Sequence, residues 1–239
     1  MIVRRIGSVI SAFLVLYLLI GCSRRPLIEM EAVSPLLESI SRFSPEITSF
    51  KGFGQITFSE QGMRQSGRID ALWSDNGDFS AYIYSPFGTT VASVEGDRSG
   101  GKVAFDQEEL LFGMDERLVM IPFSWGKNVN FSQFIRYFTG RMPETAIMER
   151  APDSISLEGN YARATWHDHA FSVTAVVSRR SQEIETVEFQ FPRHGLEPWN
   201  LQFTNFNQGL ASQIKIEENS RNYILIRYND ISADLVSHE

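Results

Sequence analysis

The chain has 239 residues, 43% of them hydrophobic and 12% aromatic, with a single cysteine and a formal net charge of −7. This length suits one large domain with a sizeable core. The acidic balance argues against a nucleic-acid partner, which needs a basic face, and a lone cysteine excludes an internal disulfide.

An apolar run near the N-terminus predicts an export signal. Arg4 and Arg5 are followed by an uncharged, mostly apolar stretch over residues 6–20 and then by Gly21 and Cys22. The stretch is about 15 residues long, which fits the hydrophobic region of a signal peptide. It is shorter than the ~20 residues that a membrane-spanning helix needs. We therefore predict that residues 1–21 are a signal peptide.

The tetrapeptide Leu19-Ile20-Gly21-Cys22 resembles the lipobox of bacterial lipoproteins. The resemblance implies cleavage before Cys22 and acylation of its sulfur and its new amine, and two or more acyl chains anchor a protein stably. The alternative is an uncleaved segment with a free or intermolecular thiol. Ser23 stands where an aspartate would signal retention in the inner membrane, which implies sorting to the outer membrane. Loss of Arg4 and Arg5 with the signal peptide changes the formal net charge from −7 to −9.

Residues 22–33 are predicted to be a lipidated tether, and a short amphipathic helix should follow them. Ser34 suits the N-cap and Pro35 the first helical position. The helix should end near residue 45. Its apolar stripe, at helical spacing, consists of Leu36, Ile40 and Phe43.

From about residue 50 the hydrophobic period becomes two, which predicts β-strands. Five short runs before residue 107 alternate in this way, and turn signals such as "SDNGD" and "EGDRSGG" separate them. Side chains on one side of these strands should face a common interior. They are Ile56, Phe58, Ile69, Trp73, Phe79, Ile83, Ala92 and Val94.

Residues 107–148 interrupt the strands. The run "QEELLFGM" at 107–114 favours a short helix, and "NFSQFIRYF" at 130–138 favours a clearer one. Asn130 is a candidate cap of the second helix, and Gly140 stands where that helix should stop. Its apolar stripe includes Phe131, Phe134, Ile135 and Phe138. Six or seven further strands should follow, up to about residue 229.

These elements predict one mainly β domain over residues 34–232, with about 11 antiparallel strands. A large antiparallel sheet must protect its edges and cover its apolar face. Curling around an apolar interior, with an amphipathic helix over the open side, satisfies both needs. Periodicity alone does not decide whether that interior is packed or hollow.

Signals for catalysis or metal binding are weak. His167 and His169 in "WHDH" would share one face of a strand and could form a metal pair, but an exposed hairpin turn explains them better because no third ligand is suggested. The carboxylates at 108–117 fit a solvated face, and His194 fits a turn. The sequence lacks the G-x-S-x-G, H-E-x-x-H and Walker motifs. We therefore expect no enzymatic activity, no metal site, no catalytic residues and no cofactor.

The stretch "YIYSPFGTTVASVEGD" places a bulky apolar side chain at a tight turn. Pro86 fixes the turn, Phe87 lies at its tip, and Gly88 lets the chain reverse. Phe87 either folds back onto the sheet edge or projects and enters a bilayer. Burial of one Phe contributes about 1.5–3 kcal/mol, which is enough to orient a tethered domain.

This stretch and "FSQFIRYFTGRMP" resemble the LolA/LolB-like family of lipoprotein carriers, and most closely its outer-membrane receptors. The resemblance covers residues 34–229. Tyr137 lies near the usual Trp of the family, and the segment at 106–128 is longer and more acidic than expected. The family fold implies an unclosed antiparallel barrel with a helical lid over a hydrophobic cavity. The inner-face residues above, with Leu36, Ile40, Phe43, Phe134 and Phe138, would line that cavity.

The resemblance also implies a function. A monomer, anchored to the periplasmic face of the outer membrane, would accept lipoproteins from a periplasmic LolA-like carrier by binding their acyl chains. It would then insert them into the inner leaflet of that membrane, helped by the loop at Pro86, Phe87 and Gly88, where the receptors carry an apolar leucine. Two alternatives remain open: a carrier or sensor of another envelope lipid, and a structural or assembly accessory lipoprotein with a filled core.

Overall fold

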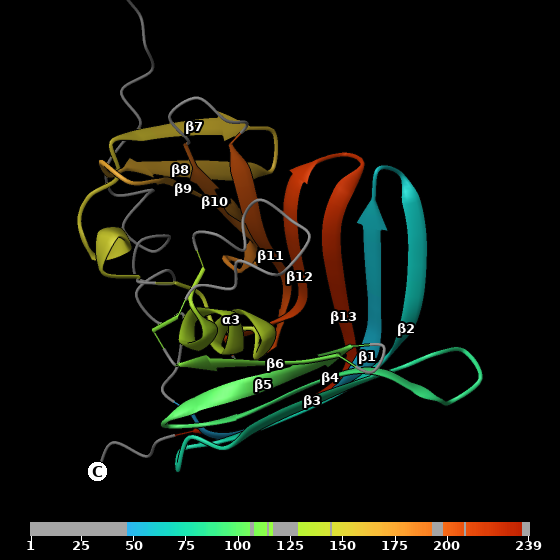
Figure 1. The fold of residues 1–239 in the computed structure, drawn as a ribbon. Helices are drawn as coiled ribbons and strands as arrows, with labels where there is room; N and C mark the ends of the chain where they lie inside the picture. The colour runs from blue at the N-terminus through green and yellow to red at the C-terminus, as the bar shows by residue number, and fades with distance from the viewer. Residues whose placement is uncertain are drawn as a thin grey trace, which may run out of the picture. The chain divides into compact units, whose positions relative to one another are not determined.

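The fold is one antiparallel sheet with an apolar inner face. The computed structural model describes residues 47–105, 108–113, 115–116, 129–143, 145–192, 198–207 and 209–235. The predicted signal peptide, the tether, Cys22, the helix at 34–45 and His194 lie outside these residues. Within them the strands, shown in Figure 1, are β1 Ile47–Glu60, β2 Met63–Ser74, β3 Phe79–Tyr84, β4 Thr90–Asp97, β5 Gly100–Phe105, β6 Glu108–Gly113, β7 Ser154–Glu158, β8 Tyr161–His167, β9 Ser172–Ser178, β10 Ile184–Phe191, β11 Trp199–Asn207, β12 Leu210–Asn219 and β13 Asn222–Leu235.

The strand order is β6-β5-β4-β3-β2-β1-β13-β12-β11-β10-β9-β8-β7, so two meanders meet where β1 pairs with β13. The edge strands β6 and β7 are not paired with each other, and the sheet is therefore unclosed. This confirms the predicted mainly β, unclosed antiparallel architecture. The described residues form 13 strands, compared with the predicted number of about 11.

The prediction of a helix at 107–114 was wrong, because Glu108–Gly113 forms β6 and pairs with β5 from end to end. The sequence "EELLFG" has the carboxylates and leucines of a helix, but its tertiary partner decides its conformation. In the strand, Phe112 is buried on the inner face while Leu111, its neighbour, is 77% exposed.

The two faces of the sheet differ because side chains alternate along each strand. One inner row crosses the junction and continues to the β7 edge in register: Ile56, Ile226, Ile214, Phe203, Val187, Ala175, Ala164 and Ile155. The outer face is polar. There the Tyr82 hydroxyl donates to Glu95 at 2.8 Å, and the Lys102 ammonium lies 3.6 Å from Glu95.

A glycine explains how the two longest strands bend at their junction. The register of β1 against β13 shifts between Phe53 and Gly54. A Cβ on Gly54 would lie 2.0 Å from the Arg227 carbonyl oxygen, so no other residue fits this close approach without a shift. Such an irregularity bends a strand and increases its twist. In Figure 1, β3–β6 accordingly run in a different direction from the upper parts of β12 and β13.

Helix α3 Phe131–Phe138 covers the inner face next to β5 and β6 (Figure 1). Its predicted cap is confirmed, since the side-chain oxygen Oδ1 of Asn130 accepts from the Gln133 backbone N–H at 2.8 Å. The Gln133 side chain in turn accepts from the Asn130 backbone N–H at 3.1 Å, which completes a capping box. A short 3-10 helix, Thr145–Glu149, follows.

Two glycines of the sheet form the seat for this helix. An inner row of large side chains on β1–β6 is interrupted at Gly96 and Gly101, which pair with each other. The Phe131 ring fills the gap, fully buried, and stacks on Phe112 with 6.3 Å between ring centroids. A Cβ on Gly101 would lie 2.0 Å from the Phe131 ring. The missing side chains thus let α3 approach the sheet closely.

The Gly101→Ala variant should therefore unfold more easily, because the methyl group would force Phe131 out of its seat. Overpacking of this kind costs about 1–3 kcal/mol. Gly113→Ala, on the paired strand, is the matched control, since the nearest atom to its added Cβ lies 3.9 Å away. Urea unfolding should show a lower free energy for the first variant and a change near zero for the second. Equal losses of unfolding free energy in the two variants would show that Phe131 does not depend on the space left at Gly101.

Candidate functional site

The predicted cavity-lining residues come together on the inner face. Seven of them belong to one buried apolar cluster, and Phe58, Trp73 and Ala92 are partly buried against it. Leu36, Ile40 and Phe43 lie outside the described residues. The structure brings together strand and helix residues that are up to 82 positions apart, from Ile56 to Phe138. The seven are Ile56, Ile69, Phe79, Ile83, Val94, Phe134 and Phe138.

The predicted cavity-lining residues come only from the strands before α3 and from the helices, so the strands after α3 were not included. The strands after α3 contribute large side chains that are at most 1% exposed. Their sequences alternate as clearly as those before the helix, so the same period-two signal identifies them. What was missing was the pairing of β1 with β13, which makes the two meanders one continuous face. The residues are Trp166, Phe189, Leu201, Phe203, Ile214 and Ile226.

The C-terminal end of α3 is fastened to the sheet. The Tyr228 hydroxyl on β13 donates to the Phe138 carbonyl at 2.7 Å, and burial raises the pKa of this tyrosine, so it remains a neutral donor. Gly140 adopts φ +71° and its carbonyl accepts from the Ala211 backbone N–H at 3.2 Å. A Cβ on Gly140 would lie 2.5 Å from the Ala211 oxygen. The predicted helix stop at Gly140 is confirmed, and it is also a docking point.

The aromatic side chains of α3 fill the space beneath it. Phe134 and Phe138 are at most 4% exposed, and their ring centroids are 4.2 Å apart. Phe138 also meets Phe79 edge-on at 6.5 Å. Two hollows lined by described residues, of about 760 and 380 Å³, lie along β1–β6, and neither is lined by a residue of α3. A ligand beneath α3 would therefore have to displace the aromatic side chains of this helix.

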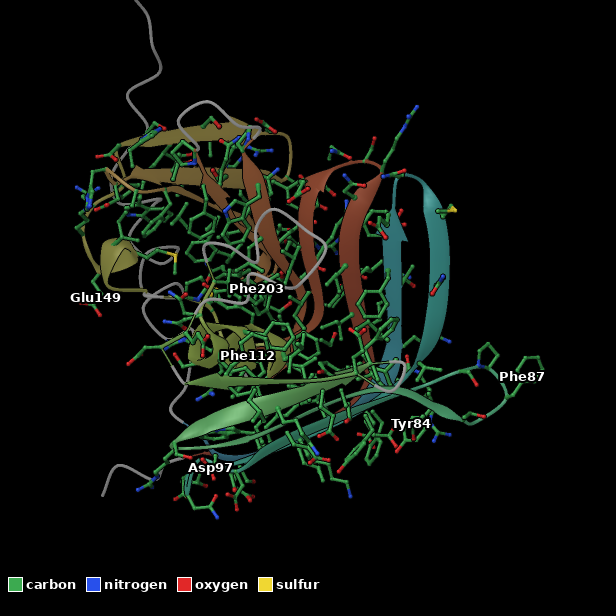
Figure 2. The ribbon with its side chains drawn as sticks, viewed as in Figure 1. Tyr84, Phe87, Asp97, Phe112, Glu149 and Phe203 are labelled. Carbon is green, nitrogen blue, oxygen red and sulfur yellow. The ribbon has the colours of Figure 1, made fainter. Side chains whose placement is uncertain are left out.

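Phe87 projects from the tip of the β3–β4 hairpin, as Figure 2 shows, and is 95% exposed. The turn around it is held by hydrogen bonds. The Gly88 backbone N–H donates to the Ser85 carbonyl at 2.9 Å, and the Ser85 hydroxyl accepts from the N–H groups of Phe87 and Thr89 at 3.2 and 3.3 Å. Pro86 suits the second position of such a turn, and Gly88 takes φ +84°. Of the two expectations, the projecting conformation is the one present.

The histidines of "WHDH" lie at the end of β8 and just after it. His167 ends β8 and its Nδ1 lies 3.3 Å from Asp153, while His169 lies in the following turn and its Nδ1 contacts Asp168 at 2.5 Å. Hydrogen bonds from His167, led by its backbone N–H, lower the pKa of Asp153. In the part of the chain that the structure describes, no group of three metal-ligating side chains occurs. No helix among these residues is long and apolar enough to span a membrane.

Comparisons with known proteins give likenesses of fold only. No protein-family model matches the chain, and no curated protein matches it. Solved structures that resemble it include a LolA superfamily protein from Nitrosomonas europaea, with 12% identity, 87% of this chain and 94% of that chain covered, and a TM-score of 0.47. Another is a putative outer membrane lipoprotein-sorting protein domain from Vibrio parahaemolyticus, with 10% identity, coverage of 88% and 95%, and a TM-score of 0.48. A DUF1329 family protein from Desulfovibrio piger shares 8% identity over 87% and 94%, with a TM-score of 0.49. Likenesses of this extent do not identify the family of this chain.

Removal of the Tyr228 hydroxyl should loosen α3. In Tyr228→Phe the Phe138 carbonyl keeps its buried position but loses its donor, which costs about 1–3 kcal/mol of unfolding free energy. Tyr223→Phe is the control on the same strand, because the Tyr223 hydroxyl hydrogen-bonds to no described residue although its ring is 8% exposed. Chemical denaturation should separate the two variants. A loss that is equal in both would show that the hydroxyl does not hold the helix.

Proposed function

We propose that this chain is a lipid-anchored envelope protein that binds acyl chains on the inner face of its sheet. Anchored by an acylated Cys22 at the periplasmic face of the outer membrane, it would accept lipoproteins from a soluble LolA-like carrier and release them into the inner leaflet. The observation that carries the proposal is the combination of one apolar sheet face and an aromatic side chain, Phe87, that is 95% exposed on a hydrogen-bonded turn of the same sheet.

The inner face supports acyl binding because it is continuous and apolar over both meanders. Burial of acyl chains scales with the apolar area removed from water, so no nucleotide or cofactor is needed for transfer. Access requires movement of α3, whose N-terminal half rests on glycines and whose C-terminal end is held by the hydrogen bonds of Tyr228 and Ala211. We infer that α3 is the lid and that its detachment opens the acyl site.

Phe87 supports the release step. A side chain that is 95% exposed and held away from the sheet can enter a bilayer without any change in the protein. Its burial there contributes about 1.5–3 kcal/mol, too little to anchor the protein but enough to orient it against the membrane. The acyl chains on Cys22 would supply the anchor itself.

If α3 is the lid, weakening its anchor should increase lipid binding. Tyr228→Phe would raise the fraction of molecules with α3 detached, and apparent affinity rises in proportion to that fraction. We expect the full chain, purified in nonionic detergent, to bind a fluorescent fatty acid or an acylated peptide with one-to-one stoichiometry, and the variant to bind it severalfold more tightly. Tyr223→Phe should leave the affinity unchanged. Absence of binding in the wild-type chain would instead favour the accessory lipoprotein with a filled core.

Phe87→Glu should separate uptake from delivery. The substitution puts a charge on the exposed tip, so folding and binding of the acylated peptide should be unchanged while its transfer to liposomes falls at least severalfold. Leu111→Glu is the matched control, since Leu111 is 77% exposed but lies on the edge strand β6. Transfer can be followed by fluorescence dequenching. Equal transfer rates in the wild-type and Phe87→Glu chains would show that Phe87 has no role in delivery.

A further inference from the structure

Two arginines at the C-terminal end of α3 form no ion pair with any carboxylate that the structure describes. Arg136 lies in the last turn of the helix, and its Nε donates to the Met142 carbonyl at 2.6 Å. Arg141 follows Gly140, and its Nε donates to the Thr139 hydroxyl at 3.0 Å. Neither guanidinium forms an ion pair with a described carboxylate. Among the described residues, neither guanidinium uses its two terminal nitrogens in a hydrogen bond.

Some charged side chains of this sheet do form ion pairs. The chain has 29 acidic residues and 22 lysines and arginines, so acidic partners are in excess. Arg68, Arg150 and Arg163 each lie 3.5 Å from a carboxylate, and Lys102 contacts two. The other described lysines and arginines without an ion pair are exposed to solvent, whereas Arg136 and Arg141 are partly buried.

Arg141 is also held in position and largely removed from water. Its guanidinium carbon lies 4.2 Å from the centroid of the Trp73 ring, a stacked arrangement that guanidinium groups favour. Burial, and secondarily the neighbouring charge of Arg136, lower the pKa of Arg141 to about 10, so the group remains charged at neutral pH. The negative end of the α3 dipole compensates this charge only in part. Two such cations side by side are destabilising unless an anion joins them.

The neighbours of Trp73 indicate what kind of anion fits. Trp73 pairs with Phe50 on one side and with Phe79 on the other, and both of these are buried on the inner face. A ligand anion at the arginines would thus be adjacent to apolar surface. The planar fork of arginine matches phosphate and carboxylate oxygens with two parallel hydrogen bonds.

We propose that Arg136 and Arg141 form a binding site for the phosphate headgroup of a lipid whose acyl chains occupy the inner face. The inference rests on the proposed acyl binding and narrows its ligand class, because the acylated cysteine of a lipoprotein carries no phosphate. It favours a phosphate-bearing envelope lipid as a ligand. The two side chains would bridge one headgroup from the end of the lid.

Two probes that differ only in the phosphate test this site. Fluorescent phosphatidic acid and fluorescent diacylglycerol with identical acyl chains are titrated with the full chain in the same nonionic detergent. We expect roughly tenfold tighter binding of phosphatidic acid, since a charge-assisted bidentate contact is strong. The Arg136→Gln and Arg141→Gln variants should each lose most of this preference and keep their affinity for diacylglycerol. Arg163→Gln, which removes a paired arginine from β8, should keep the preference.

Control measurements separate loss of phosphate binding from loss of folding. Melting temperatures show whether a variant is folded, and Arg136→Gln is informative even if the stacked Arg141 proves necessary for folding. Equal affinity of the wild-type chain for both probes, or an unchanged preference in both variants, would overturn the phosphate site and leave acyl binding intact. Melting temperatures measured with added inorganic phosphate, at matched ionic strength, show whether the bound anion is a lipid headgroup or free phosphate. If it stabilises the wild-type chain but not the variants while neither lipid binds, the anion is free phosphate and the proposed acyl binding fails.

Discussion

The structure depends on the need to cover one apolar face of an open sheet. An antiparallel sheet this large buries its inner side chains only if other elements lie against them. Among the described residues, α3 meets much of that need with five buried side chains in eight positions. Its seat on Gly96 and Gly101 and its hydrogen bond from Tyr228 thus hold this cover against the sheet.

The same interaction links the fold to its proposed use. A helix that is short, capped at one end and fastened by a few hydrogen bonds at the other can be displaced at a lower free energy than a strand in the middle of the sheet. The sheet retains its own backbone hydrogen bonds when the helix moves. A lid of this type exposes apolar surface only when a ligand replaces the contacts of its aromatic side chains.

The arginines at the end of α3 and the exposed Phe87 belong to different parts of the fold. Arg136 and Arg141 lie where the lid ends, next to the apolar interior, whereas Phe87 lies at a hairpin tip far from any described partner. The first position suits recognition of a polar headgroup above buried chains. The second suits contact with a membrane, so that uptake and release would depend on different residues.

The sequence by itself determined the class of fold and most strands, because alternation of apolar residues and Gly or Asn/Asp turns are local signals. It also located α3, its Asn130 cap and its Gly140 stop, since these depend on residues a few positions apart. It misassigned Glu108–Gly113, where pairing with β5 overrides a helical pattern. The tertiary structure alone decided the β1–β13 junction, the Phe131 seat, the Tyr228 bond and the unpaired arginines. The first three, and the stacking of Arg141 on Trp73, join residues that are distant in the chain, and a local pattern does not specify which distant partner will be present.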